Sequence, residues 1–331
     1  MARPKVFATR VLPKEAEEML REAADLEVWP DYFRPPKEVL LEKARDCAGF
    51  LTTIEDPMDV EVMEAGRGVL RVVANFAVGY NNIDVAAASR LGIAVSNTPN
   101  VLEKTTADLA FALIMATARR VVDGDRDVRL GRWSNWHPLG YVGRDIHGAT
   151  LAIIGLGQIG LEVAKRGLGF DMKVTYHSRT RKPVEEARHG LRWRPDLAAA
   201  LREADFVSIH TPLTPETRHL MGRKELASMK PTAILVNTSR GPVVDCEALY
   251  EAVRDGVIWG AGLDVTEPEP LPPGHPLLTL PNVVVTPHVG SASIQTRTAM
   301  AALAARNILA CLRGEPMPSC VNGEAAGKPA P

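Results

Sequence analysis

Three polar side chains in the second half of the chain, Arg240, Asp264 and His288, each follow an apolar run typical of a buried strand. Ligands of open α/β sheets bind at the carboxyl ends of the strands, so the three side chains are expected to meet there. A guanidinium can hold a carboxylate through paired hydrogen bonds. An imidazole can donate or accept a proton near neutral pH. The combination predicts a site that binds an acid and moves a proton.

A glycine-rich turn gives the second chemical signal. Residues 151–160 read Leu-Ala-Ile-Ile-Gly-Leu-Gly-Gln-Ile-Gly, an apolar strand that runs into G-x-G-x-x-G and a helix expected over Gln158–Leu168. Gly155 permits the tight turn, Gly157 lets backbone approach a pyrophosphate, and Gly160 lets the helix pack close to the strand. The start of that helix would direct N–H groups at the phosphates. The turn predicts a dinucleotide site, and hydride from a nicotinamide would equip the three side chains to reduce a 2-oxo acid.

The end of the next strand, Lys173–Tyr176, indicates which dinucleotide binds. NAD-preferring sites usually carry an acid there, which accepts hydrogen bonds from the ribose hydroxyls. In this chain the position holds Ser178, followed by Arg179, Thr180 and Arg181. A hydroxyl and two guanidiniums suit a 2′-phosphate, although arginines after a strand are also common as solvated surface charges. Because the acid is missing, we expect NADP(H), with NAD(H) as the alternative.

Composition limits the class of protein. The chain has 331 residues, a formal net charge of -1 and 46% hydrophobic residues. This length allows two domains, and the charge balance favours neither nucleic acid nor an anionic membrane as a partner. No apolar stretch approaches the roughly 20 residues that span a bilayer, and no signal-peptide pattern opens the chain. The four widely spaced cysteines form no C-x-x-C pair, so we expect reduced thiols in a cytoplasmic protein, with neither a disulfide framework nor a metal site.

Short apolar runs alternate with helical patterns such as Lys14–Ala23, which predicts parallel sheets in an α/β protein. About six strands surround the glycine-rich turn, the number in a complete dinucleotide-binding sheet. Strands are expected at Lys5–Ala8, Gly49–Leu51, Leu70–Ala74 and Ala94–Ser96, then near Leu151 and Val174 and at Phe206–Ile209, Ile234–Val236, Gly260–Asp264 and Val283–Thr286.

Two long helices are expected to connect the two series of strands. The first covers Thr105–Val122, with Thr105 or Thr106 as its N-cap, and the second covers Ser291–Leu312. Gly314 stands where the C′ glycine of the second helix belongs. The stretch after Gly314 is rich in Pro, Gly and Ala, so fraying is expected there.

With these motifs in hand, the chain resembles the D-isomer-specific 2-hydroxyacid dehydrogenases over nearly all of its length. The motifs that carry this resemblance are Gly155–Gly160, Asn237–Gly241, Asp264–Pro270 and Pro287–Gly290. Within the family the chain is most similar to the glyoxylate/hydroxypyruvate reductases, through Gly131–Trp136, Leu263–Leu271, His275–Leu278 and Arg313–Pro318.

The resemblance implies two doubly wound parallel-sheet domains. Residues 1–101 and 289–331 would form a discontinuous, flavodoxin-like substrate-binding domain. Residues 102–288 would form a Rossmann-type NAD(P)-binding domain, with the active site in the cleft.

The resemblance also implies catalytic roles. Arg240 would hold the substrate carboxylate, and His288 would protonate the carbonyl oxygen as general acid in reduction and act as base in the reverse direction. Glu269 would pair with the imidazole, with Glu267 as the competing candidate. The residues implied to bind cofactor are Thr106, Gly155, Leu156, Gly157, Gln158, Ile159, Gly160, Ser178, Arg179, Thr180, Arg181, His210, Thr211, Pro212, Thr238, Ser239, Arg240, Asp264, His288 and Gly290.

Substrate contacts are implied in the first domain as well. Backbone N–H groups of Leu51 and Thr52 and of Val78 and Gly79 would bind the carboxylate, although the sequence itself shows only transitions from strand to loop there. Trp133 and Trp136 lie in a polar loop, where large aromatic side chains tend to be interface anchors. The resemblance implies a homodimer in which Trp136 reaches the partner's active site, and simple packing is the alternative role.

The expected activity is NADP(H)-dependent reduction of glyoxylate to glycolate and of hydroxypyruvate to D-glycerate. The alternatives within the family are reduction of other 2-oxo acids, phosphoglycerate dehydrogenase and formate dehydrogenase. The absence of a C-terminal regulatory extension counts against phosphoglycerate dehydrogenase. An NAD(H)-sensing corepressor is the alternative from another class, and the absence of a long disordered tail or basic patch counts against it.

Overall fold

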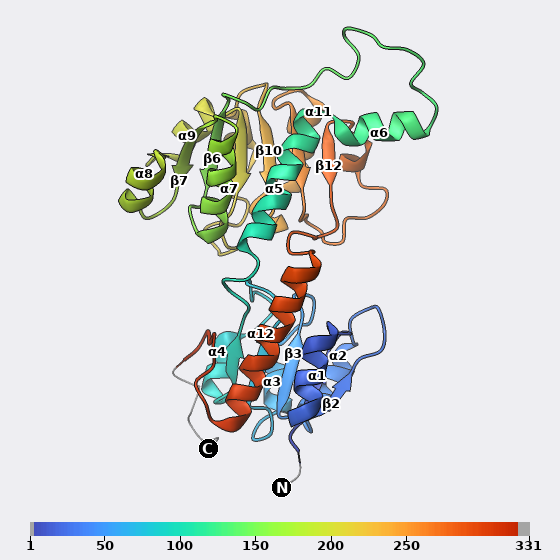
Figure 1. The fold of residues 1–331 in the computed structure, drawn as a ribbon, viewed down its shortest axis with the longest axis vertical. Helices are drawn as coiled ribbons and strands as arrows, with labels where there is room; N and C mark the ends of the chain where they lie inside the picture. Colours follow the sequence, from blue (N-terminus) through green and yellow to red (C-terminus); the bar gives the residue numbers. More distant parts are fainter. Residues whose placement is uncertain (1–2, 324–331) are drawn as a thin grey trace. The chain divides into compact units, whose positions relative to one another are not determined.

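The computed structural model describes residues 3–323, which divide into two compact units. The first unit contains the chain up to Leu102 and again from Ala292, and the second contains Glu103–Ser291 (Figure 1). The expected domain boundaries followed residues 101 and 288, so the boundaries of the units fall one and three residues later. Each unit is built on its own parallel sheet.

The five strands of the first unit lie in the order β2-β1-β3-β4-β5, and every pair in the sheet is parallel. This is the flavodoxin-like order. Helices α1 and α12 pack on one face of the sheet, and α2, α3 and α4 pack on the other. The elements are β1 (Lys5–Ala8), α1 (Lys14–Ala23), β2 (Asp25–Val28), α2 (Lys37–Ala44), β3 (Gly49–Thr52), α3 (Val60–Ala65), β4 (Val72–Asn75), α4 (Val85–Arg90), β5 (Ala94–Ser96) and α12 (Ile294–Arg313).

The seven strands of the second unit lie in the order β12-β11-β10-β9-β6-β7-β8, also with parallel pairs. The order reverses between β6 and β9, the switch point at which doubly wound sheets bind ligands. Helices α5 and α7 cover one face, and α9, α10 and α11 cover the other (Figure 1). The strands are β6 (Thr150–Ile154), β7 (Lys173–His177), β8 (Arg192–Trp193), β9 (Phe206–Ile209), β10 (Ile234–Asn237), β11 (Gly260–Leu263) and β12 (Val283–Val285). The helices are α5 (Glu103–Ala118), α6 (Val121–Arg129), α7 (Gln158–Gly169), α8 (Pro183–His189), α9 (Leu197–Glu203), α10 (Arg223–Ala227) and α11 (Cys246–Arg254).

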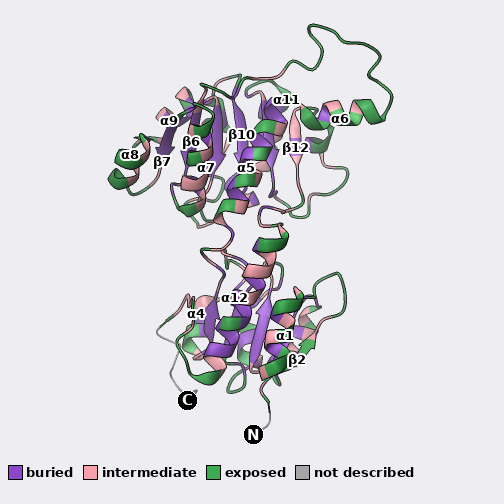
Figure 2. Cartoon of the chain, in the orientation of Figure 1, coloured by how far each residue is buried: buried purple, intermediate pink, exposed green. Residues whose placement is uncertain are grey.

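Most central strands are buried on both faces (Figure 2). All residues of β3, β4, β9, β10 and β11 are buried, because helices cover each sheet on two sides. Their sequences are therefore mostly apolar, and the two parallel strand orders confirm the fold class: two doubly wound parallel sheets.

Two strands were missed in the sequence. β2 alternates buried and exposed positions at the edge of its sheet, and β8 has only two residues. Neither forms the continuous apolar run that marks the other strands. The second sheet therefore has seven strands rather than about six.

The predicted helix Thr105–Val122 was wrong in its bounds. α5 begins at Glu103, so Thr105 and Thr106 lie inside its first turn and neither is the N-cap. The helix ends at Ala118, and Arg120 has a left-handed φ of 53° before α6 starts. A left-handed residue cannot continue an α-helix, which divides the predicted element in two.

The C-terminal part differs from expectation at both ends of α12. The helix starts at Ile294 rather than Ser291, after the N-cap Ser293. The predicted C-terminal glycine is confirmed, since Gly314 has a left-handed φ of 75°. Fraying directly after it was wrong, because the Val321 N–H donates to Val95 O, at 2.8 Å. Residues 324–331 lie outside the described chain. No helix of the described chain is long and apolar enough to cross a membrane.

Candidate active site

The glycine-rich turn joins β6 to α7, and two of its glycines are required by the protein itself. Gly155 has a φ of 98°, and a Cβ built there would lie 2.8 Å from the carbonyl oxygen of His210. A Cβ on Gly160 would collide with the carbonyl oxygen of Gly155. Backbone lies against backbone at both positions, so only glycine fits.

Gly157 is different, because a Cβ built there meets no described atom within 4 Å. The residue is the N-cap of α7, where backbone N–H groups and the helix dipole favour a phosphate. The side-chain oxygens of Thr211 and Thr238 are buried and have no hydrogen-bond partner among the residues described. They follow β9 and β10, and β9 pairs with β6 at the switch point. Buried hydroxyls without partners are costly, so this edge fits a polar ligand such as a dinucleotide.

Arg240 follows β10 on a turn that Asn237 shapes. The Asn237 Oδ1 accepts hydrogen bonds from the N–H of Ser239, at 3.0 Å, and from its hydroxyl, at 2.8 Å. The Asn237 Nδ2 donates to the Arg240 carbonyl oxygen, at 2.9 Å. Burial lowers the pKa of the Arg240 guanidinium, and the charge of Glu269 raises it. A guanidinium that has lost much of its hydration gains more from an anionic partner than an exposed one, so Arg240 is well suited to an anionic ligand.

The imidazole of His288 contacts the carboxylate of Glu269. The distance from Nδ1 to Oε1 is 2.5 Å, and both side chains are partly exposed. A carboxylate at Nδ1 favours a proton on that nitrogen, so Nε2 is the ring nitrogen left to exchange a proton with a ligand. Arg240 interacts electrostatically with the same Glu269, so the second unit brings the three predicted catalytic residues together.

Glu267, the competing candidate, makes different contacts. Its Oε1 accepts a hydrogen bond from Arg218, at 2.5 Å, and its Oε2 lies 2.7 Å from the His219 Nε2. Both of its oxygens are therefore occupied by residues outside the predicted triad. The structure pairs His288 with Glu269 instead.

Asp264 holds the turn that carries His288. The buried carboxylate accepts hydrogen bonds from the Thr286 hydroxyl, at 2.6 Å, and from the N–H groups of Val289 and Gly290, both at 2.8 Å. Burial raises the pKa of Asp264, and these donors and His288 lower it. The turn places His288 at a left-handed φ of 54°, a conformation that needs such support in a residue with a side chain.

Thr106 and Gly290 lie together at this edge, because a Cβ built on Gly290 would be 3.3 Å from the Thr106 Cγ2. Contacts of Thr106, Asp264 and Gly290 with a cofactor stay predictions.

Side-chain contacts to Glu186 hold the loop that follows β7. The Tyr176 hydroxyl donates to the Glu186 Oε1, at 2.6 Å, and accepts from the Lys182 N–H, at 2.7 Å. Arg181 donates from Nε and Nη2 to Glu186, at 2.9 and 2.8 Å, and lies over the Trp193 ring. These partners, Arg181 first, lower the pKa of Glu186 to about 2. The Arg181 guanidinium is thus paired within the protein, the Ser178 hydroxyl donates to the Thr180 carbonyl oxygen at 2.7 Å, and Arg179 is exposed.

His210 directly follows β9. Its Nε2 lies 2.8 Å from the Ser208 hydroxyl, and burial lowers its pKa to about 3. Its backbone packs against Gly155, together with Thr211. The segment that carries His210 and Thr211 therefore lies beside the glycine-rich turn, and its contact with a cofactor stays a prediction.

Comparison with known proteins decides the family. Residues 111–290 match the family model described as D-isomer specific 2-hydroxyacid dehydrogenase, NAD binding domain. The chain is 51% identical over 304 residues to a glyoxylate reductase of Korarchaeum cryptofilum, covering 92% of this chain and 91% of the other. It is 49% identical to the glyoxylate reductase of Thermococcus gammatolerans, with 92% and 91% covered. The chain belongs to the D-isomer specific 2-hydroxyacid dehydrogenases.

Solved structures agree with this family assignment. A protein from Thermus thermophilus superposes with a TM-score of 0.91 at 49% identity, with 96% of this chain and 99% of the other covered. An NADPH-dependent glyoxylate/hydroxypyruvate reductase from Sinorhizobium meliloti, solved with NADP and malonate, gives 0.86 at 32% identity, with 99% of each chain covered. This dehydrogenase is therefore an NAD(P)-dependent oxidoreductase.

The predicted carboxylate loops of the dehydrogenase lie in its first unit. Leu51 and Thr52 are the last residues of β3 and pair in register with Ala74 and Asn75 of β4. Val78 and Gly79 follow β4 in a loop. Strand residues commit their N–H groups to the sheet, so the loop pair is better suited to a ligand.

The segment after α6 carries exposed apolar side chains. Trp136 is 80% exposed and Trp133 62%, with Leu130, Leu139 and Val142 also exposed. Figure 2 shows α6 and the segment that follows it largely as exposed surface. Contiguous exposed apolar side chains are more frequent at interaction surfaces than elsewhere on soluble proteins, and the predicted role of Trp136 in a dimer stays a prediction.

Sequence reasoning gave no role to Asn237, Thr286 or Tyr176. Asn237 could have been found from Asn-x-Ser after a strand, because an asparagine side chain often bonds the N–H two residues later. Thr286 and Tyr176 have no such local signal, since their partners Asp264 and Glu186 lie far away in the sequence.

Proposed function

We propose that this dehydrogenase reduces glyoxylate to glycolate and hydroxypyruvate to D-glycerate, with NADPH as the preferred cofactor. The contact between His288 and Glu269, beside Arg240 and at the same sheet edge as the glycine-rich turn, carries the proposal. Relatives named glyoxylate reductase at about 50% identity support the substrate.

In the proposed reaction, Arg240 binds the substrate carboxylate through its planar pair of donors. The reduced nicotinamide, when bound, supplies the hydride that reaches the carbonyl carbon. His288 donates the proton from Nε2 to the carbonyl oxygen, so that carbon gains a hydride and oxygen gains a proton. Glu269 stabilises the imidazolium before transfer and holds the ring afterwards, because its carboxylate lies at Nδ1 in both states.

The residues proposed to hold the cofactor form three groups. Gly157, Gln158 and Ile159 at the start of α7 would bind the pyrophosphate, and Thr211 and Thr238 would give their hydroxyls to the dinucleotide. The other members of the proposed set are Thr106, Gly155, Leu156, Gly160, Ser178, Arg179, Thr180, Arg181, His210, Pro212, Ser239, Arg240, Asp264, His288 and Gly290.

A direct assay tests this function. The purified protein is given NADPH or NADH with glyoxylate, hydroxypyruvate, pyruvate, phosphohydroxypyruvate and phenylpyruvate, and the oxidation of cofactor is followed. We expect the highest kcat/KM with glyoxylate and hydroxypyruvate. A higher value with another acid would change the substrate assignment. Cofactor binding without oxidation by any 2-oxo acid would indicate a binding protein instead.

For cofactor choice, we propose that Ser178 and Arg179 contact the 2′-phosphate while Arg181, bound to Glu186 and Trp193, positions their loop. Ser178→Asp combined with Arg179→Gln should move the preference toward NADH by about tenfold or more, since a charge-assisted contact contributes about 1.5–3 kcal/mol. Arg202→Gln, an exposed arginine on α9, is the matched control. Wild-type preference for NADH would contradict the cofactor assignment.

We propose that the exposed segment around Trp133 and Trp136 forms a homodimer. Its apolar side chains support an interface, and the position of Trp136 at its most exposed point supports a role as an anchor. Trp136→Ala with Trp133→Ser should shift sedimentation from dimer toward monomer. A wild-type monomer at micromolar concentration would contradict the proposal.

The cysteine pattern supports a cytoplasmic location. Cys47, Cys246, Cys311 and Cys320 are unpaired thiols. Structural disulfides persist in oxidising compartments, so free thiols are typical of the cytoplasm. Cell fractionation with an antibody to the protein would measure the location.

A further inference from the structure

Three partly or fully buried asparagines, Asn75, Asn82 and Asn97, lie at the Val78–Gly79 loop of the first unit. Asn75, the fully buried last residue of β4, donates from Nδ2 to the Gly79 carbonyl oxygen, at 2.9 Å. Its Oδ1 accepts the Thr52 hydroxyl, at 3.1 Å. One amide therefore ties the loop to the end of β3.

Asn97, directly after β5, holds the neighbouring peptide. Its Nδ2 donates to the Val78 carbonyl oxygen, at 2.8 Å. The Asn97 carbonyl oxygen in turn accepts the Ser319 hydroxyl, at 2.7 Å, and the Ser319 N–H donates to Asn307 of α12, at 2.9 Å. This series of bonds connects the loop to a helix more than two hundred residues away.

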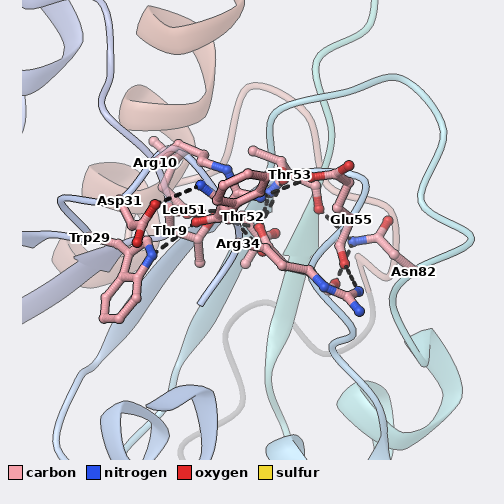
Figure 3. Close-up of polar contacts among 12 residues, drawn as sticks. Thr9, Arg10, Trp29, Asp31, Arg34, Leu51, Thr52, Thr53, Glu55 and Asn82 are labelled. Atoms are coloured by element: carbon pink, nitrogen blue, oxygen red, sulfur yellow. Dashed lines mark hydrogen bonds and ion pairs between the residues drawn. The ribbon is translucent and has the colours of Figure 1, made fainter. Parts of the chain in front are cut away.

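Asn82 completes the set on the β3 side. Its Nδ2 donates to the carbonyl oxygens of Thr53, at 2.9 Å, and Asp56, at 3.0 Å, while its Oδ1 accepts from Asn75, at 3.1 Å. Figure 3 shows Asn82 beside the segment that carries Thr53 and Glu55. The Asp56 carboxylate, fully buried, accepts the Thr53 N–H at 2.7 Å and the Thr9 hydroxyl at 2.5 Å. Both loops are thus fixed to each other.

Because the peptide bond is planar, these contacts also fix the direction in which the neighbouring N–H groups of the loop point. In a planar trans peptide the carbonyl of one residue and the N–H of the next point to opposite sides. A donor that fixes the Val78 carbonyl therefore fixes the Gly79 N–H on the other side of the same plane. Asn75 does the same for the Tyr80 N–H through the Gly79 carbonyl.

We propose that Asn75, Asn82 and Asn97 are positioning residues for substrate, which set the direction of the backbone N–H groups that bind its carboxylate. The inference rests on the proposed function, because it needs a carboxylate substrate at the Val78–Gly79 loop. Asn75 and Asn97 contact the loop directly, and Asn82 holds Asn75, so all three act through the loop rather than on the substrate. Their effect should therefore be on substrate affinity and not on the chemical step.

Asn97→Asp tests the proposal most directly. The carboxylate has the same size as the amide but cannot donate to the Val78 carbonyl, so the loop loses its anchor. We expect KM for glyoxylate and the Kd of oxamate, an unreactive carboxylate analogue, to rise about tenfold, which corresponds to about 1.4 kcal/mol. We expect kcat and the Kd of NADPH to change less than about twofold, since a hydrogen bond in the first unit leaves the cofactor residues untouched. Asn97→Ser, which adds no charge, should also raise KM and the Kd of oxamate while leaving kcat and the Kd of NADPH nearly unchanged.

Asn322→Ala is the matched control. This asparagine also ties down β5, through the Val95 N–H and the Ile93 carbonyl oxygen, but it makes no contact with the loop. It should lower Tm without moving KM. Hydrogen exchange measured by mass spectrometry should rise over residues 76–82 in Asn97→Asp and stay at the wild-type rate in Asn322→Ala.

Wild-type KM in both Asn97 variants, in an enzyme that reduces glyoxylate, would overturn this inference alone. An equal rise of KM in Asn322→Ala would overturn it as well, because the effect would then be general destabilisation. Wild-type protein that reduces no 2-oxo acid would remove the proposed function, and this inference with it.

Discussion

The two units share one architecture but place different chemical groups at the ends of their strands. The second unit places an arginine, a carboxylate and an imidazole after its strands, so its chemistry is carried by side chains. The first unit places Val78 and Gly79 after β4, and amide side chains behind them fix the backbone. Parallel sheets can thus present either kind of group at the same edge. In the proposed function, side chains of the second unit react, whereas the fixed backbone of the first unit contributes N–H donors that bind the substrate.

The sharpest test of this contrast is His288→Ala. Loss of the proton donor should lower kcat by roughly 10²–10⁴. The Kd of NADPH should stay near the wild-type value, because the glycine-rich turn is unchanged. Steady-state kinetics with glyoxylate and a fluorescence titration with NADPH measure both. Near-normal turnover would show that side-chain chemistry in the second unit does not include this imidazole.

Gly157 and Gly160 should differ in what their substitution affects. A side chain at Gly157 should impair ligand binding, and one at Gly160 should impair stability. Gly157→Ala should leave Tm unchanged, because nothing lies within 4 Å of the added carbon. The substitution should weaken NADPH binding about 10- to 100-fold, the size of one charge-assisted hydrogen bond.

Gly160→Ala is the comparison, since the added carbon collides with the Gly155 carbonyl. It should cost about 1–3 kcal/mol of unfolding free energy. Thermal unfolding and NADPH titration measure both variants. A stability loss in Gly157→Ala equal to that in Gly160→Ala would remove the distinction.

Arg240→Lys tests whether planar geometry matters in the second unit. Lysine keeps the charge but loses the paired donors, so KM for glyoxylate should rise about tenfold. The same measurement on pyruvate would report the general carboxylate contact. An unchanged KM for both acids would contradict the carboxylate role of Arg240.

The last expected effect concerns stability and pH rather than ligand binding. Burial lowers the pKa of His210 to about 3, while an unfolded histidine titrates near 6.5. Between these values the unfolded chain binds a proton that the folded chain does not. Unfolding free energy should therefore fall as pH drops from about 6.5 toward 3, by up to about 1.4 kcal/mol per pH unit. Denaturation of His210→Gln should show a shallower dependence, and an identical slope would mean that His210 titrates normally.

The sequence was most informative where residue type and chemistry coincide. Glycine, arginine and histidine after apolar runs indicated the sheet edge, because few other roles require those residues there. Register within a loop was harder, since Glu267 and Glu269 differ only in which partner reaches them. The amide anchors Asn75, Asn82 and Asn97 were not foreseen, because a backbone N–H has no residue signature and its supports come from distant segments. β2 and β8 escaped for a related reason, as edge strands carry little apolar signal.

The position of α12 after the whole of the second unit in the chain affects the order of folding on the ribosome. Ala301, Ala304, Ala305 and Ile308 of this helix cover one face of a sheet whose strands all precede residue 97. Until α12 emerges, that face has only α1 against it, while the whole of Glu103–Ser291 has already been synthesised. The later-encoded unit can therefore complete its folding first, and the earlier one must keep an apolar surface from aggregating during synthesis.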